Sequence, residues 1–269
     1  MRSRVRVGSF MLFFLVAAAA HAQRVDRVWL EDLTWMEVAT AVNAGKTTII
    51  VPIGGTEQNG PHMVLGKHNV RVRMLAERIA MTLGNALVAP IIAYVPEGSI
   101  DPPAGHMRFP GTISIPERTF ESLLESAARS FKRHGFRDIV FIGDHGGYQK
   151  NEQNVAARLN REWSATPARV HAIVGYYDVT ETRYRDLLRR RGFRDDEIGT
   201  HAGLADTSLA LALAPSLVRE DRLEAAAAEA EKNGVHGDPR RSSAELGGLG
   251  VDVIVAETVN EIRNAVKRR

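Results

Sequence analysis

The sequence predicts a single α/β domain with a largely parallel sheet covered by helices. Apolar runs of strand length alternate along the chain with amphipathic stretches of helix length, which is the pattern of βαβ units. Most connections between these elements are short, and the chain contains no internal repeat and no low-complexity linker. The 269 residues, 44% of them hydrophobic, are enough to bury a sizeable core.

Four apolar runs predict the strands, and helical spacing of apolar residues predicts the helices. The predicted strands are 47–53, 86–95, 138–142 and 169–177. The predicted helices are 70–83, 116–134, 151–163, 201–213, 222–232 and 240–267. Pro116 suits a first helical turn, Asp238 and Pro239 suit the start of the last helix, and the glycines at 247–250 could interrupt that helix. Two longer connections, 96–115 and 177–200, have a length that often carries function.

The first 22 residues have the pattern of a secretory signal peptide. Three arginines lie within the first six residues, an apolar run follows at 10–20, and Ala20-His21-Ala22 supplies a small-x-small cleavage pattern. The run is short for a membrane span, so an uncleaved anchor is the alternative rather than the expectation. We therefore expect a mature chain of residues 23–269, periplasmic or secreted, with no membrane association after cleavage.

Composition excludes several classes of site and partner. The chain has no cysteine, so it cannot form disulfides, thiolate metal sites or cysteine nucleophiles. Any metal must be held by His, Asp or Glu. The 35 Lys and Arg exceed the 32 Asp and Glu by three, and that excess lies in the predicted signal peptide. A basic surface for nucleic acid is therefore not expected on the mature chain.

Polar clusters rich in glycine and histidine follow two predicted strands and begin a later helix. They lie at 54–68, 144–147 and 201–208. In open α/β sheets ligands bind beyond the carboxyl ends of the strands, so the first two clusters are in the expected place. Six side chains in these clusters could serve a zinc or manganese site. They are Glu57, His62, His68, His145, His201 and Asp206.

The motifs, taken in order, resemble those of the creatininase (creatinine amidohydrolase) family. The family pattern P-x-G-S-x-E-Q-H-G-P-H-L-P-L-G-T-D appears at 52–68 as P-I-G-G-T-E-Q-N-G-P-H-M-V-L-G-K-H. Four further family segments, F-P-G-T-I-S, N-G-H-G-G-N, H-A-G-x-x-E-T-S and G-D-P, correspond to 109–114, 143–148, 201–208 and 237–239. The resemblance spans about residues 51–247, which is most of the chain.

This resemblance implies a three-layer α/β/α domain, often a homohexamer, whose divalent metal ions activate water against a C–N bond. By position, Glu57, His68 and His145 match ligands of the first metal. His201 matches a catalytic histidine that handles protons, and Asp206 matches an acid beside the site that is a ligand in some relatives.

Two departures from the family pattern affect the second metal. His68 stands where the family has a bridging Asp, and Asn59 stands where it has a His ligand. A neutral imidazole offers one lone pair and cannot bridge two ions, and an amide oxygen is a poor ligand for zinc. We therefore expect one divalent ion per chain, zinc with manganese as the alternative, on Glu57, His68 and His145 with Asp206 completing the set.

The sequence thus predicts a metal-dependent hydrolase that cleaves a C–N bond of a small amide or cyclic amide. The metal would activate water, Asp206 would complete the coordination or orient the water, and His201 would protonate the leaving nitrogen. A non-catalytic binding or assembly protein with a degenerate site is the main alternative, and a metal-dependent lyase or oxygenase is a third. The expected partners are a small-molecule substrate and further copies of the chain.

Three other polar residues near these motifs have predicted roles. His106 and Arg108 precede the F-P-G-T segment and could line the substrate pocket. His62 is expected to stabilise its loop rather than to bind metal.

Overall fold

A four-stranded parallel sheet forms the centre of the computed structural model, which describes residues 27–267. The predicted signal peptide at 1–22 lies outside the described residues. The strand order is β2-β1-β3-β4, and the strands are β1 (Thr48–Ile53), β2 (Ala86–Val88), β3 (Asp138–Gly143) and β4 (Arg169–Ala172). Every residue of β1 and β3 is buried, as the continuous apolar sequence of a strand covered on both faces predicts.

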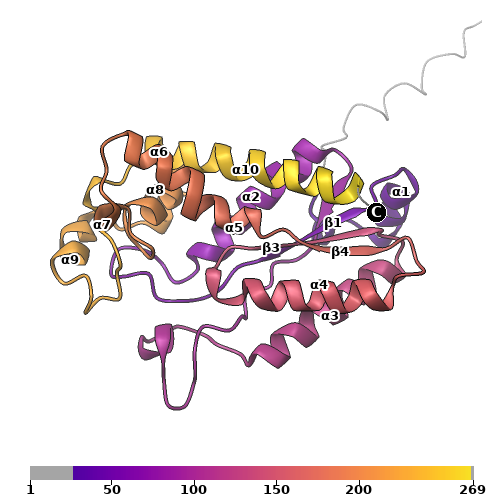
Figure 1. The fold of residues 1–269 in the computed structure, drawn as a ribbon, viewed down its shortest axis with the longest axis horizontal. Helices are drawn as coiled ribbons and strands as arrows, with labels where there is room; N and C mark the ends of the chain where they lie inside the picture. The colour runs from indigo at the N-terminus through magenta and orange to yellow at the C-terminus, as the bar shows by residue number, and fades with distance from the viewer. Residues whose placement is uncertain (1–26, 268–269) are drawn as a thin grey trace, which may run out of the picture.

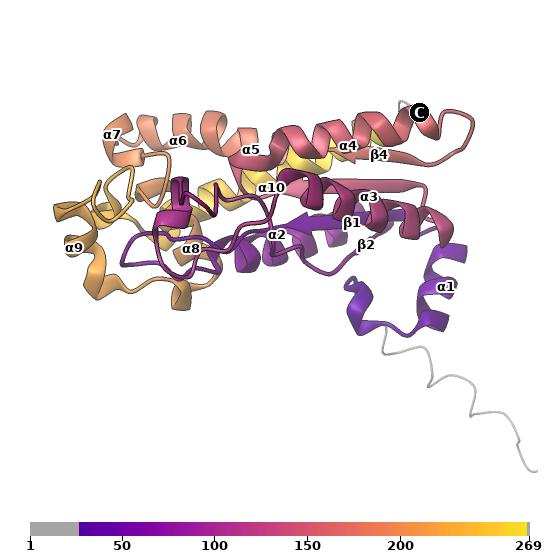
Figure 2. The same ribbon diagram turned by 90° about the horizontal axis from the view of Figure 1, so that it is seen from below.

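Helices cover both faces of the sheet and give the three-layer arrangement (Figures 1 and 2). One face packs against α2 (Lys67–Leu83) and α10 (Ala244–Lys267) through residues such as Ile50 and Val140, and the same apolar core extends to α8 (Leu204–Leu213), which packs on these two helices. The opposite face packs against α3 (Glu117–Arg133) and α4 (Gln149–Glu162). Neighbouring strand residues alternate between the two cores because successive side chains point to opposite faces. The predicted fold class is confirmed.

Shorter elements complete the described chain. Within residues 27–267, no helix is both long enough and apolar enough to cross a bilayer. The remaining helices are α1 (Trp35–Asn43), α5 (Gly175–Val179), α6 (Arg185–Arg190), α7 (Asp195–Ile198) and α9 (Leu223–Ala228), with a π-helical turn η4 (Thr180–Tyr184). The short 3₁₀ turns are η1 (Leu30–Asp32), η2 (Gly105–Arg108), η3 (Gly146–Tyr148), η5 (Pro215–Leu217), η6 (Glu220–Arg222) and η7 (Pro239–Arg241).

Several predicted boundaries are wrong. The strand predicted at 86–95 ends at Val88, and its second half is a loop with one isolated bridge to β1, between Ile53 and Ile92. The strand predicted at 169–177 ends at Ala172, and α5 begins at Gly175. The helix predicted at 222–232 is shorter, and most of the connection predicted at 177–200 is helical. Buried apolar runs look alike in strands, helices and covered loops, so periodicity alone misplaced these ends.

The last helix is continuous through its glycines. A Cβ at Gly247 would overlap the Ser208 carbonyl oxygen of α8, and one at Gly250 would lie 2.7 Å from the Leu209 side chain. The glycines therefore permit the close packing of α8 on α10 and do not interrupt the helix. Because all four strands are parallel, the loops after β1, β2 and β3 meet at one edge of the sheet, where the polar clusters gather.

Candidate active site

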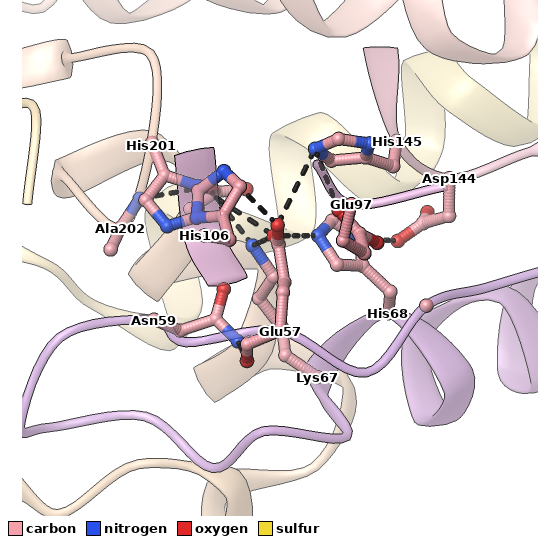
Figure 3. Close-up of polar contacts among 12 residues, drawn as sticks. Glu57, Asn59, Lys67, His68, Glu97, His106, Asp144, His145, His201 and Ala202 are labelled. Atoms are coloured by element: carbon pink, nitrogen blue, oxygen red, sulfur yellow. Dashed lines mark hydrogen bonds and ion pairs between the residues drawn. The ribbon is translucent and has the colours of Figure 1, made fainter. Parts of the chain in front are cut away.

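Glu57, in the loop after β1, is the centre of the polar cluster (Figure 3). Its side chain is fully buried, and its two oxygens face different neighbours. His68 Nε2 lies 2.6 Å from Oε1, whereas His106 Nε2 and His145 Nε2 lie 3.2 and 3.4 Å from Oε2. Burial raises the pKa of Glu57, but His68, His145 and Lys67 outweigh burial and hold that pKa well below its ordinary value. Glu57 is therefore ionised.

A second buried carboxylate, Glu97, reaches the same cluster from the loop after β2. Neither Glu97 oxygen has a hydrogen-bond partner among the described residues, and the same is true of Glu57 Oε2. His145 Nε2 lies 3.7 Å from Glu97 Oε2. Burial and the negative charge of Glu57 raise the pKa of Glu97 to about 10. Three carboxylate oxygens buried without a hydrogen-bond partner are costly unless a cation neutralises them, so this pair has the chemistry of a metal site.

Two groups of side chains in the described part of the chain could hold a metal ion, and they share Glu57. The first, which we call the Glu97 group, is Glu57, Glu97 and His145. The second, which we call the His106 group, is Glu57, His106 and His201. Within each group the possible ligand atoms lie within 4.8 Å of one another. Figure 3 shows the two groups on opposite sides of the Glu57 carboxylate.

His68, predicted as a ligand, lies between two carboxylates. Its Nε2 faces Glu57 Oε1, and its Nδ1 lies 2.7 Å from Asp144 Oδ2. Asp144 is held in turn by Arg71 Nε and the Tyr176 hydroxyl, each at 2.7 Å. The structure thus places His68 beside Glu57 but outside both donor groups, and each of its nitrogens has an acidic partner.

Asp206, also predicted as a ligand, is held by donors on both oxygens. Arg71 Nη1 lies 2.7 Å from Oδ1, while Lys67 Nζ and the Ala202 backbone N–H lie 3.2 and 2.9 Å from Oδ2. These contacts keep Asp206 at the cavity wall and outside both donor groups. The ligand roles of His68 and Asp206 stay predictions, and the geometry favours Glu97 as the third ligand beside Glu57 and His145.

His201 lies where a histidine can accept a proton. Its Nε2 lies 3.0 Å from the Gln58 backbone carbonyl oxygen and 3.1 Å from the Gln58 side-chain amide nitrogen. In the tautomer that donates its Nε2 N–H to that carbonyl, Nδ1 is free to accept a proton. Nδ1 faces Glu57 Oε1 at 3.7 Å. Burial, together with the positive charge of Lys67, lowers the pKa of His201 to about 3, so its imidazole is neutral at pH 7.

Gln58, His62 and Asn59 shape the loop that presents Glu57. The Gln58 amide donates to the Gly234 carbonyl and also contacts the rings of His106 and His201, each at 3.1 Å. The Asn59 amide nitrogen donates to the Glu57 carbonyl oxygen at 2.9 Å, so it fixes the loop from within. His62 Nε2 contacts the Thr207 hydroxyl at 3.0 Å, which fits its predicted role of stabilising the loop.

A cavity of about 140 Å³ opens beside the donor groups. Its lining includes Lys67, His106, His145 and His201. The rest of the lining combines polar and apolar side chains from α5 to α8: Tyr177, Thr180, Glu181, Arg185, Ile198 and Leu209. His106 lines the cavity, as predicted, whereas Arg108 is exposed on η2. The arrangement suits a small polar molecule.

Sequence reasoning missed Glu97, Lys67 and Arg71 as members of the cluster. Glu97 lies in the long connection after the second predicted strand, whose length was the available signal. Lys67 lies near the end of the first polar cluster and Arg71 at the start of a predicted helix, and single basic residues of this kind are ordinarily solvated. In the structure only 0% of Lys67 and 3% of Arg71 is exposed, and this burial can be seen only in the three-dimensional arrangement.

Comparison with known proteins gives the family. A sequence model of the creatininase family, described as creatinine amidohydrolase, matches residues 31–262. The chain belongs to the creatininase family. Creatinine amidohydrolase of Pseudomonas putida is 31% identical over 202 residues, which cover 73% of this chain and 75% of that protein. The mycofactocin precursor peptide peptidase of Mycolicibacterium smegmatis is 28% identical over 249 residues, 82% and 84% of the two chains.

Solved creatininase structures share the fold. A crystal structure of creatinine amidohydrolase superposes with a TM-score of 0.75 at 26% identity, covering 89% of this chain and 98% of that one. Two further creatininase structures, both with a TM-score of 0.73, are described as a manganese form and as a mutant of Zn–Zn type. A divalent metal in this family therefore agrees with the donor groups found here.

Proposed function

We propose that this creatininase-family chain is a metal-dependent hydrolase that cleaves the C–N bond of a small amide or cyclic amide. The observation that carries the proposal is the pair of buried carboxylates, Glu57 and Glu97, which converge with His145 and have oxygens without hydrogen-bond partners among the described residues. Relatives described as creatinine amidohydrolase and as a peptide peptidase support hydrolysis as the reaction class.

The donor chemistry fits a divalent ion of the zinc or manganese kind. The Glu97 group offers two carboxylates and one imidazole, a set that either ion accepts. Burial lowers the pKa of His145 to about 4, so its imidazole is neutral and can act as a ligand at pH 7. When bound there, such an ion supplies a water of lowered pKa and polarises the substrate carbonyl.

The neighbouring side chains supply proton transfer and orientation. Nδ1 of neutral His201 accepts a proton from the attacking water and delivers it to the leaving nitrogen, which is a poor leaving group unless protonated. Gln58 holds His201 and His106 through its amide and carbonyl, so both rings keep their orientation toward the cavity. The cavity volume of about 140 Å³ supports a small molecule as the substrate.

The direct test is hydrolysis by purified mature protein. We would assay cyclic amides, formamides and short peptides with zinc or manganese supplied, and follow release of the new amine. We expect turnover that a chelator removes and that either ion restores. Glu57→Gln should abolish turnover, whereas Glu162→Gln, which changes an exposed ion pair with Arg129 on the surface, should leave it unchanged.

Two results would contradict the proposal. If the protein bound a metal but hydrolysed none of these substrates, a non-catalytic binding role would be favoured. If turnover persisted in Glu57→Gln at the wild-type rate, the cluster around Glu57 would not be the active site.

A further inference from the structure

Lys67 is a buried cation with few partners at the centre of the site. It is the first residue of α2, and its side chain is fully buried. Its Nζ lies 3.2 Å from Asp206 Oδ2 and 4.0 Å from Glu57 Oε1. An ammonium group has three donors, yet the described residues give this one a single hydrogen bond, to Asp206. Such burial is costly, so the position of the charge needs an explanation.

The position of Lys67 bears on the His106 group. Lys67 Nζ and His201 Nδ1 both lie within 4.0 Å of the same oxygen, Glu57 Oε1. A divalent ion held by Glu57, His106 and His201 would therefore lie close to a fixed positive charge that is shielded from water. Like charges at such range repel strongly in a buried site. Figure 3 shows the Glu97 group on the other side of the Glu57 carboxylate, toward His145, whose Nε2 lies 3.4 Å from Oε2.

The number of charged side chains in the cluster also favours a single divalent ion. Four carboxylates converge here: Glu57, Glu97, Asp144 and Asp206. Lys67 and Arg71 pair with three of them, and His68 lies between Glu57 and Asp144, 2.6 and 2.7 Å from an oxygen of each. Glu97 has no lysine or arginine partner among the described residues, so one divalent ion on the Glu97 group would supply the positive charge that it lacks. A second ion would add two further positive charges to a cluster that already holds Lys67, Arg71 and the first ion, which is unfavourable inside the protein.

We propose that the Lys67 ammonium takes the place of a second metal ion. It supplies positive charge to Glu57 and Asp206, keeps the His106 group free of metal, and so leaves His106 and His201 available to the substrate. The inference rests on the proposed function only in taking the Glu97 group as the site of the first ion. It concerns this chain's own lysine, and metal stoichiometry tests it without any assay of turnover.

The experiment counts ions per chain in folded protein. Wild type, Lys67→Met and Lys67→Arg would be dialysed against zinc or manganese, freed of excess ion, and measured by elemental analysis, with circular dichroism as the check on folding. We expect one ion per chain in wild type, two in Lys67→Met, and one in Lys67→Arg, which keeps the charge. Lys67→Thr is a second neutral variant, smaller than methionine, for use if Lys67→Met does not fold.

A double variant locates the added ion. In Lys67→Met with His106→Ala, the His106 group has lost a ligand, so the count should return to one. Manganese gives an independent signal, because two ions that share Glu57 should show magnetic coupling in an electron paramagnetic resonance spectrum, and one ion should not.

The outcomes separate this inference from the proposed function. One ion per chain in both wild type and folded Lys67→Met would overturn the role of Lys67 and leave the proposed function intact. Two ions in wild type would also overturn it, since the lysine would then not exclude the second ion. No ion in wild type would overturn the proposed function and this inference together.

Discussion

Four imidazole rings surround the Glu57 carboxylate, and neighbouring groups hold them in place. His68 is held by Asp144, and Gln58 contacts both His106 and His201. These partners set which nitrogen of each ring faces the carboxylate, and therefore which rings can bind an ion and which can move a proton. The chemistry of the site depends as much on these supporting contacts as on the ring types.

Replacing His201 tests its role in proton transfer. His201→Ala should keep the fold and the bound ion but lower turnover by about 10²–10⁴-fold, because the leaving nitrogen loses its proton donor. Steady-state kinetics together with metal analysis checks this. Loss of the ion along with activity would make His201 a ligand and would contradict the assignment of roles made here.

Glu97 should make the metal-free protein less stable as the pH rises. Its pKa is raised to about 10, whereas in the unfolded chain it is near its ordinary 4.5. Between pH 7 and 9 the folded chain therefore retains a proton that the unfolded chain has lost, so rising pH favours unfolding. Histidines whose pKa is lowered by burial, such as His145 and His201, titrate below this window.

The measurement is the Tm of chelator-treated protein at pH 7, 8 and 9. We expect the Tm to fall across this range in wild type and to fall less in Glu97→Gln, which carries no titratable group there. Equal slopes for the two proteins would show that Glu97 is already ionised at pH 7.

Zinc binding to wild type should also release a proton, which calorimetry in buffers of different ionisation enthalpy detects.

For individual residues, the sequence predicts the site where a motif matches the family pattern, and it does not predict the site residues outside those motifs. Glu57, His145 and His201 were predicted as site residues, and the structure brings all three into the donor groups. Glu97 could not be predicted because its place in the site depends on the path of the loop after β2. Lys67 could not be predicted because nothing in the neighbouring sequence indicates that its charge is buried. His68 was placed beside Glu57, but its pairing with Asp144 was not foreseen.

The contact between α8 and α10 shows how an element can contradict its local sequence. Four residues at 247–250 include three glycines, which individually disfavour a helix, yet α10 continues through them. The close approach of Ser208 and Leu209 requires positions without a side chain, so tertiary packing outweighs local propensity. Periodicity alone could not have revealed this, because it contains no information about the partner helix.

Two neighbouring glycines offer a matched pair of variants. Gly247→Ala places a Cβ against the Ser208 carbonyl oxygen and should destabilise the protein by about 1–3 kcal/mol. Gly248→Ala meets nothing within 4 Å and should stabilise it by roughly 0.5–1 kcal/mol, because alanine favours the helix. Denaturant unfolding of both variants measures the difference. Similar effects in the two would show that α8 does not limit position 247.

Strand and helix types were predicted more successfully than their ends. The strands beginning at Thr48, Ala86, Asp138 and Arg169 all form, and they are parallel as expected. The second and fourth were predicted too long because the residues that follow are also mostly apolar. Ile173 and Tyr176, for example, are buried against helices on one face of the sheet.

At the scale of the whole molecule, we propose that the protein is exported. The basic start, the apolar run and the Ala20-His21-Ala22 pattern lead us to expect an N-terminus at or near Gln23 in the mature protein. Mass spectrometry of periplasmic and culture fractions checks this. A product with an intact N-terminal segment in the cytoplasm would refute it.

Helix α1 suggests a contact surface between copies of the chain. None of its residues is buried, and Trp35 and Met36 are 80% and 63% exposed. Exposed apolar side chains of this size favour an interface, which agrees with the homo-oligomer that we expect. Light scattering should give a mass of several chains, and Trp35→Ser with Met36→Ser should reduce it; an unchanged mass would place the interface elsewhere.

The Glu97 group joins loops that follow three adjacent strands, so an ion bound there would fasten distant parts of the chain to one another. An ion that binds only the folded chain adds to the free energy of unfolding, by about 2.7 kcal/mol when its concentration is a hundred times Kd. Supply of the ion would then govern how long the protein survives proteases as well as whether it reacts. A cell starved of that ion would be expected to lose the protein itself, with the loop carrying Glu97 among the first segments cut.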